Sequence, residues 1–250
     1  MAKEFEIVRE FEVDAPPERV WDAITVNTAG WLWPTEYEPR EGGAAGFGAT
    51  VTAWDPPRRL VARSESPEEL REVGQVLNQL DHLIEPREGG RSWVRYVHSG
   101  IFVENWDDQY DGANKHTDFY LHTLRQYLMH FAGRPAVHTD VQGPEASAAK
   151  GSFAAVGRGL GLGTSAADGA SEGDQVRVDL PGVGATTAVV DFRNDDFLGL
   201  RTEDAMYRFF GRDAWSAPVG IALHRFAPGA AGDEEANRKA WQGWLDGLYA

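Results

Sequence analysis

A switch from strand to helix, which occurs near the start of the chain and again about halfway along it, constrains the fold more than any other feature. Across residues 5–13 the apolar side chains fall mainly on alternate positions, as in a strand with one buried face. Two prolines follow, and Val20, Trp21 and Ile24 then share one side of a short helix that Asp14 is expected to cap. The opening residues therefore predict a strand, a capped turn and an amphipathic helix.

Further elements up to residue 135 complete a first unit. Apolar runs bounded by proline- and glycine-containing turns predict strands at residues 49–54, 60–64, 76–84 and 93–102. Short helical turns are expected near residues 28–33 and 67–73. A long helix is predicted at residues 114–131, because Leu121, Leu124, Leu128 and Phe131 share one face, and Gly133 and Pro135 end it.

The second half repeats this order of elements. A strand at residues 137–142 precedes an alanine-rich helix expected from Pro144 to residue 156, and a polar loop follows at residues 157–173. Strands are then expected at residues 175–180, 186–193, 197–201, 205–211 and 220–226. Asp233 is expected to cap a last helix with Trp241 and Leu245 on one face. The chain is therefore predicted to be an α+β protein of two similar units, residues 1–135 and 136–250.

Composition excludes several classes of function. The chain has 24 Lys and Arg residues against 39 Asp and Glu residues, a net charge of −15, which disfavours binding to nucleic acid or to anionic membranes. The absence of cysteine removes disulfides, thiolate zinc sites and cysteine nucleophiles. The first residues lack the apolar stretch of an export signal, so we expect a cytoplasmic location.

Four stretches of the first unit resemble a known superfamily: "FEVDAPPERVWDAI", "WDPPRRLV", "VRYVHSGIF" and "FYLHTLRQYL". They are similar to the START or birch-pollen-allergen superfamily (SRPBCC), in its heat-shock-chaperone ATPase-activator-like branch. The second unit resembles it more weakly, at residues 141–156 and 241–249. This resemblance implies a helix-grip fold, in which a curved antiparallel sheet wraps a long C-terminal helix around a cavity. Similar proteins bind lipids, sterols or polyketides, and some cyclise polyketides, protect producers from enediyne antibiotics or bind chaperones.

The hairpin formed by the strands at residues 76–84 and 93–102 carries the main candidate site. Its turn is expected to pair Leu80 with His98, His82 with Tyr96, and Ile84 with Val94, so that all six share the inner face of the sheet. Imidazoles and a phenol on this face can bind a ligand oxygen, or one histidine can act as a general base. The alternative is that they are core groups whose partners are neighbouring residues or water.

Other residues were weighed as parts of the same site. Trp54 is a candidate for stacking a flat ligand within the cavity. Trp106 and Tyr110 are expected to gate its mouth, because residues 102–116 are predicted to precede the long helix. Asp107, Asp108 and Asp111 lack the pattern of a calcium loop and indicate a solvated helix start instead. The histidines of the long helix lack the i, i+4 spacing of a zinc helix, so no metal is expected.

The leading hypothesis is non-catalytic binding of an apolar, elongated polyketide- or polyene-like molecule, in natural-product biosynthesis or self-resistance. The candidate ligand-binding residues are Leu80, His82, Val94, Tyr96, His98, Trp54, Trp106 and Tyr110. No catalytic residue and no cofactor is assigned. The expected partners are the small molecule and biosynthetic enzymes, not nucleic acid or membranes. The alternatives are an aromatase- or cyclase-type enzyme that transfers protons through His82, Tyr96 or His98, and a co-chaperone or protein-interaction module.

Overall fold

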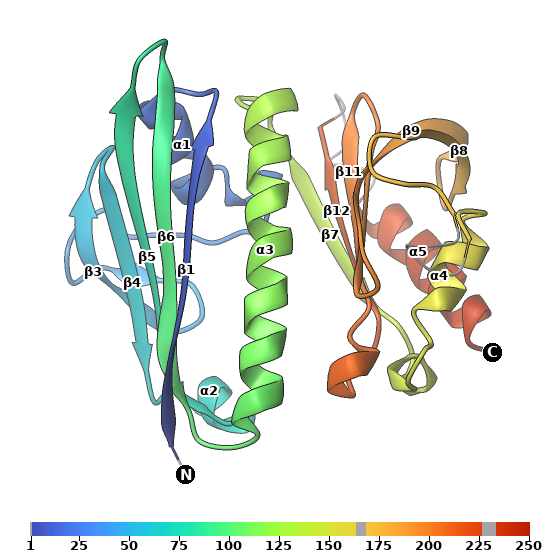
Figure 1. Cartoon of the computed structure of the whole chain (residues 1–250), viewed down its shortest axis with the longest axis horizontal. Coiled ribbons are helices and arrows are strands. Elements are labelled where there is room, and N and C mark those ends of the chain that lie inside the picture. The colour runs from blue at the N-terminus through green and yellow to red at the C-terminus, as the bar shows by residue number, and fades with distance from the viewer. Residues whose placement is uncertain (1, 164–168, 227–233) are drawn as a thin grey trace. The chain divides into compact units, whose positions relative to one another are not determined.

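The computed structural model describes residues 2–163, 169–226 and 234–250. The chain divides into two compact units, Met1–Arg134 and Pro135–Ala250. Each unit has one six-stranded antiparallel sheet and a few helices, which is an α+β architecture (Figure 1). Asp233, the expected cap of the last helix, lies outside the described residues. No described helix has both the length and the apolar character needed to cross a bilayer.

The sheet of the first unit has the strand order β1-β6-β5-β4-β3-β2. Its strands are β1 (Lys3–Val13), β2 (Ala44–Ala45), β3 (Ala49–Asp55), β4 (Arg59–Glu65), β5 (Gln75–Arg87) and β6 (Arg91–Phe102). All the predicted strands are present, and the long hairpin β5–β6 extends beyond its predicted ends. The two-residue β2 was not predicted, because so short an element leaves no periodicity to detect.

The register of the β5–β6 hairpin is the predicted one. Leu80 pairs with His98, His82 with Tyr96, and Ile84 with Val94. Since paired residues point to the same face of an antiparallel sheet, these side chains all lie on one side. A slip of one residue would have turned all of them to the opposite face.

Four helical elements complete the first unit: α1 (Pro17–Thr25), the 3-10 turn η1 (Thr28–Gly30), α2 (Glu68–Glu72) and α3 (Trp106–His130). The expected cap of α1 was wrong: Pro16 occupies the N-cap position, and no side chain caps the helix. The start of α3 was also predicted too late. Trp106, Tyr110 and Ala113 pack against the buried Phe5, Ile7 and Phe102, and this apolar stripe carries the helix back to Trp106 despite its acidic neighbours.

The second sheet repeats the connectivity of the first, with strand order β7-β12-β11-β10-β9-β8. Its strands are β7 (Val137–Gln142), β8 (Gln175–Leu180), β9 (Gly184–Arg193), β10 (Phe197–Arg201), β11 (Ala205–Phe210) and β12 (Gly220–Arg225). In both units the first strand pairs with the last, and the other strands follow in reverse order. The units are therefore alike in topology as well as in the order of their elements.

The helices of the second unit differ more from expectation. The structure has a 3-10 turn η2 (Glu145–Ala148), a short α4 (Ala154–Gly159), a 3-10 turn η3 (Asp213–Trp215) and the final α5 (Glu234–Leu248). The predicted alanine-rich helix was therefore wrong. Ala149 is extended and Gly151 has a φ of +82°, a left-handed conformation that interrupts the helix. The hydroxyl of Ser147 donates to the carbonyl of Pro144 and accepts from the amide of Val219, which stabilises the tighter turn.

The core of the second unit is filled by large side chains beneath α5. Trp241 is fully buried, and its ring lies 5.6 Å from the ring of Tyr207 and 5.8 Å from that of Phe209. Leu200 and Leu245 of the same cluster are also fully buried. Ring-to-ring packing therefore occupies the space between α5 and the sheet in this unit.

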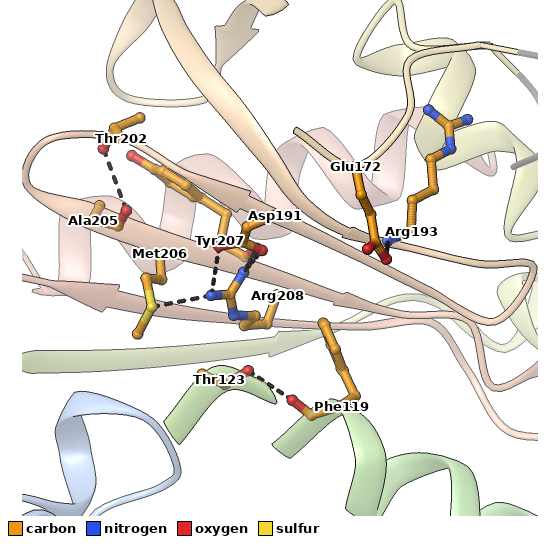
Figure 2. A network of polar contacts seen from close by, with 10 residues as sticks. All are labelled: Phe119, Thr123, Glu172, Asp191, Arg193, Thr202, Ala205, Met206, Tyr207 and Arg208. Atoms are coloured by element: carbon orange, nitrogen blue, oxygen red, sulfur yellow. Dashed lines mark hydrogen bonds and ion pairs between the residues drawn. The ribbon is translucent and has the colours of Figure 1, made fainter. Parts of the chain in front are cut away.

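A buried ion pair crosses the middle of the second sheet (Figure 2). Arg208 on β11 reaches Asp191 on β9 with two parallel bonds, Nη1 to Oδ1 at 2.7 Å and Nη2 to Oδ2 at 2.9 Å. The two side chains meet above Gly199 of the intervening strand β10, where a Cβ atom would collide with both of them. Glycine at this position therefore makes the ion pair sterically possible.

Candidate functional site

The first unit contains a cavity of about 270 Å³ between the inner face of its sheet and α3. Strands β5 and β6 supply one wall, α3 supplies the opposite wall, and the segment after α1 closes a third side. The residues that line the cavity are Ile24, Thr28, Trp31, Leu32, Trp33, Tyr37, Gln75, Asn78, Leu80, His82, Tyr96, His98, Ala113, His116, Thr117, Tyr120 and Leu121. The walls are thus apolar and aromatic, with a few polar groups.

Regular periodicities place these side chains. On β5, Asn78, Leu80 and His82 face inward at every second residue, as strand geometry requires. On α3, Ala113, Thr117 and Tyr120 recur at the three- and four-residue spacing of one helix face. The closing segment is held in place by the indole of Trp31, which donates to the carbonyl of Ala23 at 2.8 Å.

His82 is a deeply buried polar residue of the cavity. Its side chain belongs to a residue only 5% exposed, and neither ring nitrogen has a hydrogen-bond partner within the described parts of the chain. Its ring lies 4.9 Å from that of Tyr96, centroid to centroid. Burial lowers the pKa of His82 to about 4, so the imidazole is neutral at pH 7. It therefore holds one N–H donor and one lone pair.

The hydroxyl of Tyr96 adds a second polar group next to His82. Burial raises the pKa of this phenol, so it stays protonated and can donate as well as accept a hydrogen bond. The pKa of Tyr37, on the closing segment, is raised for the same reason. Both phenols are neutral at physiological pH.

His98 has a defined tautomer because of its neighbours. Its Nε2 lies 2.7 Å from Oδ1 of Asn78, and the amide of Gln75 also donates to that oxygen at 3.3 Å. An amide oxygen can only accept, so Nε2 of His98 must carry the proton. Burial lowers the pKa of His98 to about 4, and the neutral ring therefore has its lone pair on Nδ1.

The cavity lining contains no formally charged side chain: none of its residues is Asp, Glu, Lys or Arg. An ion would lose its hydration on entering and find no opposite charge there. The arrangement therefore fits a neutral molecule with a large apolar surface and a small number of hydrogen-bonding groups.

The structure brings together Leu80, His82, Tyr96 and His98 among the predicted site residues and leaves the other four outside the lining. Val94 is fully buried, and Trp54 packs edge-on against Trp21 at 5.0 Å. Trp106 and Tyr110 stack on each other at 4.8 Å in the first turns of α3. These turns already belong to α3 and cover Phe5 and Ile7, so the two rings lie within the long helix and not before it, and neither lines the cavity.

Sequence reasoning missed several lining residues, notably Trp31, Trp33, Asn78 and Tyr120. Asn78 lies two residues before Leu80 on the same strand, so the alternation that identified His82 also pointed to Asn78. Tyr120 lies one helical turn before Leu124, but it was not counted among the residues of the apolar face. Trp31 and Trp33 follow a short turn with no periodicity, and no sequence signal placed them.

Comparison with known proteins gives similar structures at low sequence identity. No family model and no curated protein matches the sequence. The di-domain ARO/CYC BexL from the BE-7585A biosynthetic pathway is 13% identical, with a TM-score of 0.44 over 98% of each chain. DynU16, a putative protein in the dynemicin biosynthetic locus, is 13% identical, with a TM-score of 0.41 over 97% of this chain and 96% of that one. CalU16 from Micromonospora echinospora is 18% identical, with a TM-score of 0.38 over 51% of this chain and 86% of that one.

The assignment of the fold depends on the architecture described above, in which an antiparallel sheet with its first and last strands paired holds a C-terminal helix on one face. This is the fold that the sequence resemblance implied. The chain is a tandem of two helix-grip units of the α+β class, and its candidate site is the cavity of the first unit.

Proposed function

We propose that the first unit binds a neutral, largely apolar small molecule in the cavity between α3 and the sheet. The observation that carries this proposal is the buried imidazole of His82, which faces an apolar cavity with both ring nitrogens unpaired among the described residues. A buried polar group without a partner costs about 1–3 kcal/mol. A bound molecule that pairs with it recovers this free energy, and its apolar part gains from leaving water.

The finer part of the proposal concerns the class of molecule. The sequence resemblance to the START superfamily supports a polyketide- or polyene-like ligand, handled in natural-product biosynthesis or self-resistance. The cavity, about 270 Å³, lies just below the roughly 300–1,000 Å³ typical of ligand pockets. It therefore suits a small ring system, or one end of an elongated chain whose remainder stays outside.

An aromatase- or cyclase-type activity is the second candidate, because His82 and Tyr96 lie side by side in the cavity. General bases work best with a pKa near the working pH. The pKa of His82, about 4, makes it a weak base at pH 7, and burial keeps the phenol of Tyr96 protonated. These values favour binding over proton transfer.

We expect the variant Leu80→Trp to weaken ligand binding by filling the cavity. 2-Naphthol and 2-methoxynaphthalene serve as probes, and isothermal titration calorimetry measures their affinities. The larger indole occupies the space of the ligand, so both probes should bind at least about tenfold more weakly, a loss of about 1.4 kcal/mol. The matched control is Leu70→Trp on α2, outside the lining, which should bind as the wild type does.

Native mass spectrometry of protein purified without denaturation gives an independent test, since a retained small molecule would appear as an added mass. The proposal is refuted if the wild type binds neither probe and carries no small molecule. It is equally refuted if Leu80→Trp binds both probes as tightly as the wild type.

A further inference from the structure

We infer that the molecule bound in the cavity donates a hydrogen bond, through a neutral hydroxyl of a phenol or enol, to an imidazole nitrogen of His98 or His82. This inference depends on the proposed function, because it names the chemical group that the same cavity selects. It follows from which hydrogen-bonding atoms of the lining are already used by the protein and which are left.

His98 provides a lone pair with a known location. Its Nε2 proton is committed to Asn78, whose oxygen also accepts from Gln75. The remaining nitrogen, Nδ1, has no proton and can only accept. No described residue donates to it. Only a donor on the ligand, or a water molecule, can pair with this nitrogen.

His82 adds a second lone pair from the next inward-facing residue pair of the hairpin, His82–Tyr96. Its neutral ring must have one nitrogen without a proton, and neither nitrogen has a partner among the described residues. His98 pairs with Leu80, which lies two residues before His82 on β5. Paired residues, and residues two apart on a strand, point to the same face, so His82 and His98 share that face. Two acceptor nitrogens therefore border the same apolar space.

A donor in the lining can also pair with the oxygen of a ligand hydroxyl group. Tyr96 lies next to His82 and retains its proton, so it can donate to the oxygen of a ligand hydroxyl while that hydroxyl donates to an imidazole. An ether or a ketone can accept from Tyr96 but leaves both imidazole lone pairs unpaired. A hydroxyl therefore satisfies more of the lining than either group.

Charge excludes the most common anionic alternative. A carboxylate would need a cation or several donors in a cavity whose lining has no Lys or Arg residue. It would also place its oxygens, which are acceptors only, against two imidazole lone pairs. The same cavity offers Trp31, Trp33 and Tyr120 as ring surfaces, which favours a planar hydroxylated ligand.

Three naphthalene derivatives that differ in one group test this inference: 2-naphthol, 2-methoxynaphthalene and 2-naphthoate. Apolar burial alone favours the methyl ether, because it has one more carbon to bury. We expect the opposite order at pH 7 by calorimetry, with 2-naphthol bound about tenfold more tightly than the ether, as one hydrogen bond allows. 2-Naphthoate should bind most weakly.

Variants identify the nitrogen that accepts the bond. In His98→Phe or in His82→Phe, the preference for 2-naphthol over the ether should fall to within twofold, while the control Tyr110→Phe, outside the lining, keeps it. A variant that does not fold can be replaced by a measurement on the wild type. In ¹⁵N spectra of the imidazoles, 2-naphthol should shift the resonance of an unprotonated ring nitrogen, and the ether should not.

The possible results separate the inference from the proposed function. If the ether binds as tightly as 2-naphthol, or 2-naphthoate binds most tightly, and Leu80→Trp blocks that binding, then the cavity is a ligand site but the hydroxyl inference is wrong. If both histidine variants keep the wild-type preference and no imidazole resonance shifts, the inference is also wrong. If no probe binds and the purified protein carries no small molecule, the proposed function fails and the inference fails with it.

Discussion

Acidification from pH 7 to pH 5 is expected to lower the free energy of unfolding of the first unit by up to about 4 kcal/mol through His82 and His98. Burial lowers the pKa of both imidazoles from 6.5 to about 4 in the folded state. Between pH 6.5 and about pH 4 these imidazoles bind protons in the unfolded chain but stay neutral in the folded chain. Stability is therefore unaffected above the unfolded pKa, falls as the pH drops below 6.5, and reaches its full loss below about 4.

Denaturant unfolding at pH 7 and at pH 5 measures this loss. Each imidazole contributes up to about 2 kcal/mol at pH 5, so His82→Phe and His98→Gln should each make the loss smaller by that amount. Comparing the pH dependence within each variant removes the effect of any overall destabilisation. A loss that is equal in the wild type and both variants would show that these histidines are not buried as neutral rings.

Removal of one partner of the Asp191–Arg208 pair is expected to destabilise the second unit by about 3–5 kcal/mol. Both side chains are buried, with 3% and 1% of their surfaces exposed, and they share two hydrogen bonds. In Asp191→Leu the buried guanidinium loses its bidentate carboxylate partner, and the attraction of that charge no longer helps to offset its desolvation. Unfolding of the full chain in urea measures the change.

The double variant Asp191→Leu/Arg208→Met separates the charge from the packing. An apolar pair of similar volume is often as stable as a buried ion pair, so most of the loss should be recovered. The control Arg238→Met removes a half-exposed partner of Glu234 and should cost less than about 1 kcal/mol. If the double variant is less stable than Asp191→Leu alone, the cost comes from lost shape and not from the unpaired charge.

Local sequence patterns predicted the structure correctly where one face of an element is apolar and the other is polar. Alternation located the strands, and the turn between β5 and β6 determined that His82 pairs with Tyr96 and Leu80 with His98. The same reasoning failed at α3 and at residues 144–156. Trp106 and Tyr110 were expected to precede the long helix, but α3 already begins at Trp106. The alanines were placed in a helix because their intrinsic preference is helical. Contacts with Phe5 and with Val219 decided these two segments instead.

The sequence by itself determined that two similar α+β units follow one another and that histidines and a tyrosine share one face of the first sheet, because strand alternation and hairpin pairing are local properties. It did not determine which of the two units leaves a cavity between its sheet and its long helix. Only the tertiary structure showed that Trp31 and Trp33 close the cavity of the first unit, whereas Trp241 and Tyr207 fill the equivalent region of the second. The volume left between a helix and a sheet depends on side chains that are distant in sequence, and no local pattern records how they fit together.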